Sequence, residues 1–339
     1  MKKVSAFLKK KGVSLSAKTY FVDAFSAMAM GLFASLLIGT IFGTIAAQTG
    51  IEFFAKMSEY CKAVQGSAMA IAIGVSLGAN GLVLFSLCVV GHCANGFGGP
   101  LGVFVITLIA CEIGKLVSKE TKIDILVTPT VIIAVGTALS LLIGPAISYI
   151  MKACGNAIMS FTELQPFWMG ILVSVTVGIA LTLPISSAAI CASIGLVGLA
   201  GGAATAGCCA QMVGFAIMSF KENRWGGLVA QGLGTSMLQM GNICKNPRIW
   251  IAPTLAAAIT GPISTMVFKL ECKGVAAGMG TCGLVGPIGV IDSTREPDAM
   301  MWVGLVLCCI VLPAVLSLLF SEIMRKLGWI REGDMKLAD

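Results

Sequence analysis

This chain contains long apolar runs with charged residues at their ends and none within them. The longest, Leu164–Phe220, spans 57 residues without a Lys, Arg, Asp or Glu. A bilayer core about 30 Å thick is crossed by roughly 20 apolar residues in a helix, so this run predicts at least two membrane-spanning helices. Charge is excluded because an ionised side chain costs about 3 kcal/mol or more at the centre of the bilayer.

Similar charge-free windows recur along the whole chain. They are Ala24–Ile51, Ser67–Cys111, Ile125–Met151, Trp225–Cys244, Ile249–Phe268, Gly274–Ile291 and Ala299–Ser321. Together with the longest run, they predict an all-α polytopic membrane protein of eight to ten transmembrane helices. Small residues repeat at every fourth position from Gly31 to Gly43, which predicts close helix–helix packing.

Three segments interrupt these predicted spans with glycine and proline, which disfavour a continuous helix. They are Gly91–Pro100, Pro184–Gly207 and Ala276–Val290. Irregular backbone at membrane depth is tolerated only inside protein or beside a water-filled cavity, and broken helices commonly build transporter sites. Each segment taken alone also fits a kinked packing helix, but three in one chain favour a solute pathway.

Charge at the two ends predicts the topology. Six lysines, Lys2 to Lys18, precede the first span, and Arg325, Lys326, Arg331 and Lys336 follow the last. The positive-inside rule places both termini in the cytoplasm and requires an even number of crossings. Lys115, Lys119 and Lys122 would then lie outside after three simple crossings, so either Gly91–Pro100 is re-entrant or this loop is an exception to the rule.

Composition supports a membrane role and excludes several others. The mean hydropathy is +0.94, and 12% of the residues are charged, about half the share in soluble domains. We attribute the net charge of +7 to the positive residues that set the membrane topology and attract anionic lipid, rather than to a nucleic-acid-binding surface. The thirteen cysteines include no C-x-x-C pair, so we predict free, packed thiols with no metal site and no cofactor.

Neutral side chains supply the polarity within the spans, whereas acids cluster near their ends. Amides offer both a donor and an acceptor, which suits hydroxyl-rich neutral solutes, although they also join helices to one another. His92, the only histidine, lies near a break and is either a solute ligand or a structural hydrogen-bonding group. All five tryptophans fit interfacial anchors of span ends. The neutral polar residues within the spans are Asn80, Asn95, Gln211, Gln231, Gln239, Asn242 and Thr281.

The block Asn246-Pro247-Arg248-Ile249-Trp250, followed by Gly261-Pro262 and the glycine-rich stretch Gly278–Gly286, resembles one group of bacterial membrane proteins. These are the enzyme IIC permease-like proteins of the phosphotransferase system that include the perfringolysin O regulator family. The resemblance covers nearly the whole chain, up to Trp302. The first block is fairly specific, whereas the glycine-rich block alone is a weak signal.

The resemblance implies a fold like that of glucose-superfamily enzyme IIC permeases, which are homodimers with re-entrant hairpins and an elevator-like transport movement. Ala276–Val290 would be the second hairpin and Pro184–Gly207 the candidate for the first. We expect four regions in the bacterial cytoplasmic membrane. They are a cytoplasmic or interfacial segment (1–22), an interface region (23–162), a transport region (163–324) and a cytoplasmic tail (325–339).

The sequence departs from the well-studied permeases of that superfamily. Those contact sugar with a histidine and a glutamate in the transport region, but His92 lies in the N-terminal half. We assign no catalytic residue and leave open whether the chain acts within an enzyme complex. Phosphorylation of a transported solute would need cytoplasmic IIA and IIB components in trans.

We expect a solute site where broken backbone meets polar side chains. Main-chain N–H groups near Thr281 suit hydroxyl or phosphate groups. Asn246 and Arg248 suit an anionic group, or else form a helix cap and interface anchor, and the polar run Asp292–Arg295 either closes the site or is a solvated loop. The candidate ligands of a sugar-type solute are His92, Asn95, Asn246, Arg248, Gly278, Gly280, Thr281 and Gly283.

The resemblance therefore implies the membrane permease component of a sugar phosphotransferase system, and the sequence is also compatible with two other functions. One is a membrane sensor or regulator that kept the permease fold without transport. The other, an ion channel, is disfavoured because the sequence predicts no charge ring.

Overall fold

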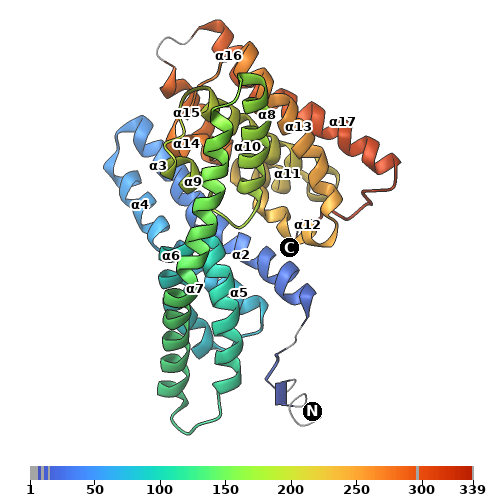
Figure 1. Ribbon diagram of the computed structural model, residues 1–339. Coiled ribbons are helices and arrows are strands. Elements are labelled where there is room, and N and C mark those ends of the chain that lie inside the picture. Colours follow the sequence, from blue (N-terminus) through green and yellow to red (C-terminus); the bar gives the residue numbers. More distant parts are fainter. Residues whose placement is uncertain (1–6, 9–10, 14–15, 295–297, 338–339) are drawn as a thin grey trace. The chain divides into compact units, whose positions relative to one another are not determined.

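The computed structural model describes residues 7–8, 11–13, 16–294 and 298–337. Within these ranges it contains helices and connecting segments but no strand (Figure 1). The N-terminal lysines Lys2, Lys3, Lys9 and Lys10, and Arg295 of the polar run Asp292–Arg295, lie outside the described residues.

The chain divides into two compact units. Unit 1 comprises Met1–Gly39 and Glu52–Ile150, and unit 2 comprises Thr40–Ile51 and Met151–Asp339. Two of the three boundaries fall within helices, in α3 (Ile38–Thr49) and α7 (Asp124–Thr162), and the third lies directly before Glu52, where the next helix begins. The other α-helices that begin in unit 1 are α2 (Ala24–Leu32), α4 (Glu52–Ala63), α5 (Gln65–Ser76) and α6 (Gly81–Val117).

Unit 2 contains ten α-helices among the described residues. They are α8 (Pro166–Thr182), α9 (Ser187–Ser193), α10 (Gly198–Met218), α11 (Phe220–Val229), α12 (Met240–Lys245), α13 (Ile251–Pro262), α14 (Gly274–Ala277), α15 (Val285–Ser293), α16 (Ala299–Val306) and α17 (Leu312–Lys326). Short π or 3-10 segments join several of them: η3 (Ala230–Gly234), η4 (Ser236–Gln239), η5 (Pro247–Trp250), η6 (Ile263–Val267), η7 (Cys282–Leu284) and η8 (Leu307–Val311).

Six helical stretches of the described chain are long and apolar enough to cross a membrane, and three shorter apolar helices accompany them. The prediction of an all-α polytopic membrane protein is therefore confirmed, while a total of eight to ten crossings stays a prediction. The six are Thr19–Thr49, Gly81–Val117, Asp124–Thr162, Gly198–Met218, Pro247–Val267 and Ala299–Lys326, and the three are Gln65–Ser76, Pro166–Thr182 and Cys282–Ser293.

In unit 1, small residues allow α5 and α6 to approach closely. A Cβ added at Gly66 would lie 2.3 Å from the carbonyl oxygen of Gly91, so only glycine fits at this crossing. The interruption predicted at Gly91–Pro100 is only two residues long. Gly98 and Gly99 leave helical geometry (φ −143° and +56°), while helix continues on both sides of them.

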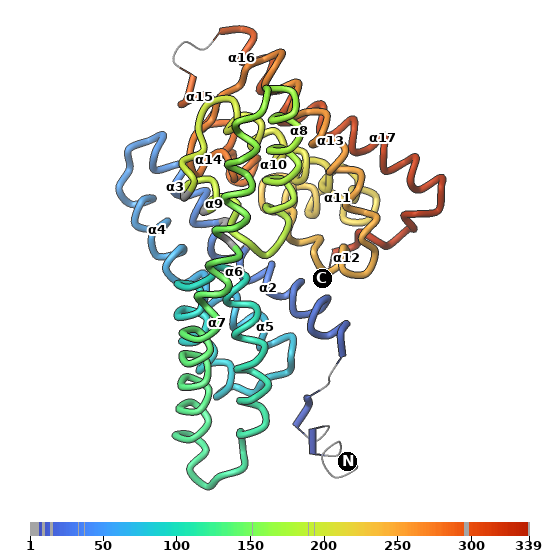
Figure 2. The backbone as a smooth tube through the Cα atoms, in the orientation of Figure 1, coloured from blue at the N-terminus to red at the C-terminus, as the bar shows by residue number. Residues whose placement is uncertain are grey.

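Helix α10 forms the centre of unit 2, with α8, α13 and α17 packed around it (Figures 1 and 2). Its side chains are buried almost without exception from Ala200 to Met218. The predicted break Pro184–Gly207 was too long, because α10 is continuous from Gly198. Gly201, Gly202 and Gly207 instead meet main-chain carbonyls of neighbouring segments: an added Cβ would lie 2.0, 1.9 and 1.9 Å from the oxygens of Cys272, Leu270 and Ser174.

Candidate functional site

Two interrupted segments meet inside unit 2. The first runs from the end of α8 through α9 to Gly198, and the second from residue 268 through α14 to Leu284. Main-chain hydrogen bonds join them, from Gly274 N to Leu196 O (2.8 Å) and from Cys272 N to Gly198 O (3.2 Å). The Ser187 hydroxyl also donates to Gly278 O (2.7 Å). The segments therefore satisfy each other's backbone groups, as irregular backbone within a membrane requires.

A glycine-rich turn, residues 278–284, ends the second segment. Gly280 and Gly283 both have φ +53°, and Leu284 has φ +59°. A side chain at Gly280 would also be crowded, because its Cβ would lie 2.8 Å from Cys208. Glycine thus permits both the left-handed backbone and the close approach to α10.

Thr281 lies at this turn and joins it to a connecting segment of unit 2. Its side chain is only 3% exposed, and its hydroxyl contacts the Gly232 carbonyl oxygen and Met212 Sδ. The Gly278 N–H donates to Val275 O (3.2 Å), so it is already used in this conformation. Of the predicted site, Gly278, Gly280, Thr281 and Gly283 therefore lie together in one turn.

The connecting segment, residues 230–239, is the second component of the site. It comprises η3 and η4, separated by Thr235 in an extended conformation (φ −159°). Gly232 accepts the Thr281 hydroxyl, and Ser236 lies 2.8 Å from the Thr182 hydroxyl at the end of α8. Residues 230–239 thus connect the glycine-rich turn to a cluster of neutral polar side chains.

That cluster, here named the Gln211 cluster, consists of Thr182, Gln211, Ser236, Trp250 and Thr254. Gln211 Oε1 accepts the Trp250 indole N–H (3.0 Å) and lies 3.4 Å from the Thr182 hydroxyl. Gln211 Nε2 donates to the Thr254 hydroxyl (3.2 Å). Thr182, Gln211 and Ser236 are fully buried, at 0% exposure, while Trp250 and Thr254 are half-buried.

The chemistry of the Gln211 cluster suits an uncharged ligand with hydroxyl groups. Every member is neutral, and all except Trp250, whose indole N–H only donates, can both donate and accept hydrogen bonds. Among the described contacts, Gln211 uses its oxygen twice and one N–H once, which leaves a second N–H as a donor. Trp250 adds an aromatic surface beside the amide, and its indole N–H fixes which way that amide points.

Asn246 and Arg248 contact another part of unit 2, the C-terminal tail (residues 327–337). Asn246 caps η5 by accepting the Arg248 N–H (3.2 Å), and its Nδ2 donates to Trp329 O (3.0 Å) and Asp334 Oδ2 (2.8 Å). The exposed Arg248 guanidinium lies 5.7 Å from the centre of the Trp329 ring. These two residues hold the tail, and the cap that the sequence allowed as an alternative is present.

His92 and Asn95 belong to α6 in unit 1, not to the unit that holds the other candidates. His92 is exposed, and the buried Asn95 Oδ1 has no hydrogen-bond partner among the described residues.

Helix α6 also carries a buried ion pair between Lys115 and Glu112 (3.2 Å). Lys115 donates a further hydrogen bond to Leu77 O (2.9 Å). Lys115 is therefore a packed residue of α6 rather than a free loop charge.

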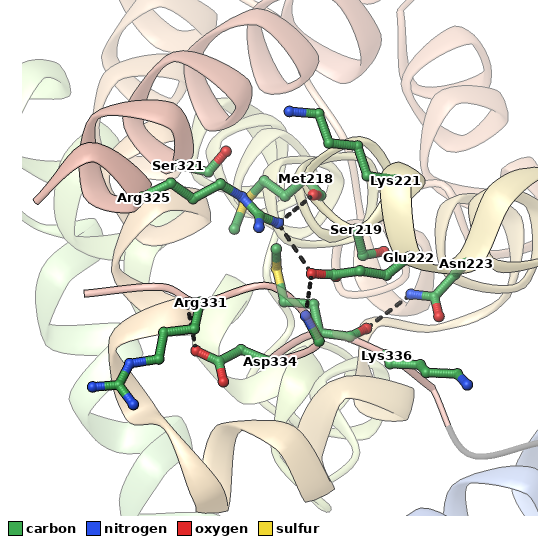
Figure 3. Close-up of polar contacts among 12 residues, drawn as sticks. Met218, Ser219, Lys221, Glu222, Asn223, Ser321, Arg325, Arg331, Asp334 and Lys336 are labelled. Carbon is green, nitrogen blue, oxygen red and sulfur yellow. Dashed lines mark hydrogen bonds and ion pairs between the residues drawn. The ribbon is translucent and has the colours of Figure 1, made fainter. Parts of the chain in front are cut away.

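A second polar region surrounds the tail (Figure 3). The Glu222 carboxylate, whose side chain is 5% exposed, accepts Arg325 Nη2 (3.3 Å) and the Gly333 N–H (3.1 Å). Neither Glu222 nor Arg325 was a sequence candidate, since both lie beside span ends, where charge is ordinary. The tail residues come from far along the chain, so no local pattern indicated this arrangement.

The sequence candidates also omitted Gln211 and Trp250. The available signal was Gln211 itself, a neutral polar residue in the middle of the longest charge-free run. The sequence predicts an interfacial anchor at Trp250, whereas in the structure its indole N–H donates to Gln211. Their contact joins positions 39 residues apart, which a single sequence does not place together.

Comparison with known proteins identifies one family. Residues 22–337 match the family described as "Phosphotransferase system, EIIC". No curated protein and no solved structure matches the chain. The family match covers the two interrupted segments, the Gln211 cluster and the C-terminal tail to Leu337.

Proposed function

Because this chain belongs to the EIIC family of the phosphotransferase system, we propose that it is the membrane permease component for a sugar-type solute. One observation carries the proposal: a fully buried neutral amide, Gln211, lies among hydroxyl groups and an indole N–H beside a broken-helix turn. Such groups recognise hydroxyl-rich solutes, and broken helices near the midplane commonly build transporter sites.

The proposed solute site combines Gln211 and Trp250 with the Thr281 turn. The Gly232 carbonyl and Ser236 connect these groups through residues 230–239. Gly278, Gly280 and Gly283 serve by allowing the turn to form, since an L side chain would be strained at φ +53° at the last two. Asn246 and Arg248 contact the tail, and we propose that they act by holding it and do not bind the solute directly. His92 and Asn95 stay candidate solute ligands in unit 1.

Transport would proceed by an elevator-like movement in a homodimer. The two broken segments and the Gln211 cluster all belong to unit 2, which supports assigning transport to it and the interface to unit 1. EIIC membership implies phosphotransferase partner components. We propose that separate IIA and IIB proteins phosphorylate the solute on the cytoplasmic side.

Uptake into proteoliposomes tests this function. We expect a sugar to accumulate as its phosphate only when the purified protein, the IIA and IIB components and a phosphoenolpyruvate-dependent phosphoryl supply are all present. Omitting any one component should reduce accumulation to the level of empty liposomes. Specific solute binding without uptake or phosphorylation would contradict the permease and favour a membrane sensor with the same fold.

The proposed cytoplasmic location of the C-terminus can be tested with a native thiol. Cys244 is exposed and lies between Asn242 and Asn246, both of which bind the tail, so it shares the tail's side of the membrane. A membrane-impermeant maleimide should label Cys244 in inside-out vesicles but not in intact cells. Desolvation raises the pKa of this thiol above its usual value, so little of the reactive thiolate is present at neutral pH. The rate of labelling should therefore increase as the pH is raised above neutral.

The Cys244→Ser variant provides the control for this experiment, because the difference between the two proteins isolates one of thirteen free cysteines. Labelling of Cys244 in intact cells would reverse the proposed orientation.

A further inference from the structure

Four amide side chains form a cradle around the C-terminal tail. Asn223 Nδ2 and Gln239 Nε2 both donate to Met335 O (2.8 and 2.9 Å), and Asn242 Nδ2 donates to Lys336 O (2.8 Å). Asn246 donates to Trp329 O, and Asn223 Oδ1 accepts the Leu337 N–H (2.9 Å). These contacts recognise the tail's main chain, so the cradle, defined as Asn223, Gln239, Asn242 and Asn246, is a binding site for the turns that the tail forms.

The tail is also anchored by its own side chains and by charge. Met335 is fully buried (0% exposed), and Ile330 is 3% exposed. The Gly333 N–H donates to the buried Glu222 carboxylate, next to Arg325 (Figure 3). Loss of the tail would leave a buried carboxylate and several amides with fewer partners, which is costly in a low-dielectric environment. The tail is thus an integral part of unit 2.

Gln239 connects this cradle directly to the solute region. Its two N–H groups donate to Met335 O and to Gln231 Oε1 (2.8 Å), and its own oxygen accepts from Asn242. Gln231 adjoins Gly232, whose carbonyl accepts the Thr281 hydroxyl. Residues 230–239 therefore carry tail contacts at Gln239 and solute-region contacts at Gly232 and Ser236.

We propose that the C-terminal tail is a latch that holds residues 230–242 in place. By doing so it keeps Ser236 against Thr182 in the Gln211 cluster. Release of the tail frees the segment whose Gly232 and Ser236 contact the glycine-rich turn and Thr182. The latch sets the mobility of this segment whatever the solute is. Its effect on transport rests on the proposed permease function.

Hydrogen–deuterium exchange on the full-length protein without added solute tests the latch. Met335→Glu places a carboxylate at a fully buried position in a tail that also meets Glu222, so the tail should detach. We expect amide exchange in residues 230–242 to accelerate by about tenfold or more, with a smaller increase in the 278–284 turn. Exchange in α5 and α6 of unit 1 should not change.

Two further variants complete the design. Lys336→Glu is the matched control, because the Lys336 side chain is exposed and its carbonyl makes the contact with Asn242. Its exchange should match that of the wild type. Gly333→Pro changes an exposed position with φ +91°. It removes the N–H that donates to Glu222 but places no charge in the protein interior, so it tests the latch if Met335→Glu does not fold.

Faster exchange confined to residues 327–337 in Met335→Glu or Gly333→Pro would overturn the latch. Because no solute is present, this outcome is independent of the uptake experiment. Uptake by the wild type, together with unchanged exchange of residues 230–242 in these variants, would refute the latch alone. Faster exchange of residues 230–242 in the variants, together with no uptake by the wild type, would refute the permease alone.

Discussion

Alanine at Gly207 is expected to prevent α8 and α10 from packing and to abolish a stable unit 2. The added Cβ would lie 1.9 Å from the Ser174 carbonyl oxygen and 2.5 Å from its carbon. Both atoms are helix backbone and cannot rotate away, so the helices must separate. We expect a loss of stability of more than about 3 kcal/mol, measured as the yield of monodisperse protein and its thermal unfolding temperature in detergent.

Gly226→Ala is the matched control, because no heavy atom lies within 4 Å of a Cβ at that glycine. It should unfold at the wild-type temperature or slightly above, since alanine is favoured over glycine in helices. Wild-type yield and unfolding temperature for Gly207→Ala would contradict the close packing described for α10.

Methionine at Gln211 is expected to weaken solute binding while leaving the fold intact. Methionine keeps the length and unbranched shape of glutamine, but it removes the acceptor of the Trp250 N–H and the donor to Thr254. Methionine also removes the second amide N–H, from which a solute hydroxyl would accept a hydrogen bond. A lost hydrogen bond of this kind costs about 1–3 kcal/mol, which corresponds to roughly a tenfold to hundredfold loss of affinity.

Gln165→Met controls for the chemical change, because Gln165 is an exposed residue at the start of α8 whose side chain makes no cap hydrogen bond. It should bind solute with wild-type affinity. Equal affinity in Gln211→Met and the wild type, measured by equilibrium dialysis, would remove Gln211 from the solute site.

The sequence predicted the membrane class and the places where helices break, because both depend on local composition. Most of the charge-free runs correspond to apolar helices, and Ala276–Val290 contains the glycine-rich turn. The run Trp225–Cys244 instead forms only short helical segments, α11, η3, η4 and α12. The sequence did not distinguish glycines that break a helix from glycines that let helices touch. Gly201, Gly202 and Gly207 were assigned to a break, but they lie within α10 and face main-chain carbonyls.

The candidate site was predicted only where its residues are neighbours in the sequence. Gly278, Gly280, Thr281 and Gly283 lie in one turn, whereas the Gln211 cluster joins five separate elements of unit 2. Asn246 was recognised as polar and near a helix start, but its partner Trp329 is 83 residues away. Contacts of that range depend on the tertiary fold, which periodicity and composition do not specify.

Thermal unfolding of the detergent-solubilised wild type, screened against sugars, polyols and sugar phosphates, tests the solute site most directly. At 100 times its dissociation constant, a ligand stabilises the folded state by about 2.7 kcal/mol. We expect at least one neutral, hydroxyl-rich compound to raise the unfolding temperature of the wild type and of Gln165→Met, and to raise that of Gln211→Met clearly less. No stabilisation of the wild type by any compound at millimolar concentration, or equal stabilisation of Gln211→Met and the wild type, would contradict a solute site at Gln211.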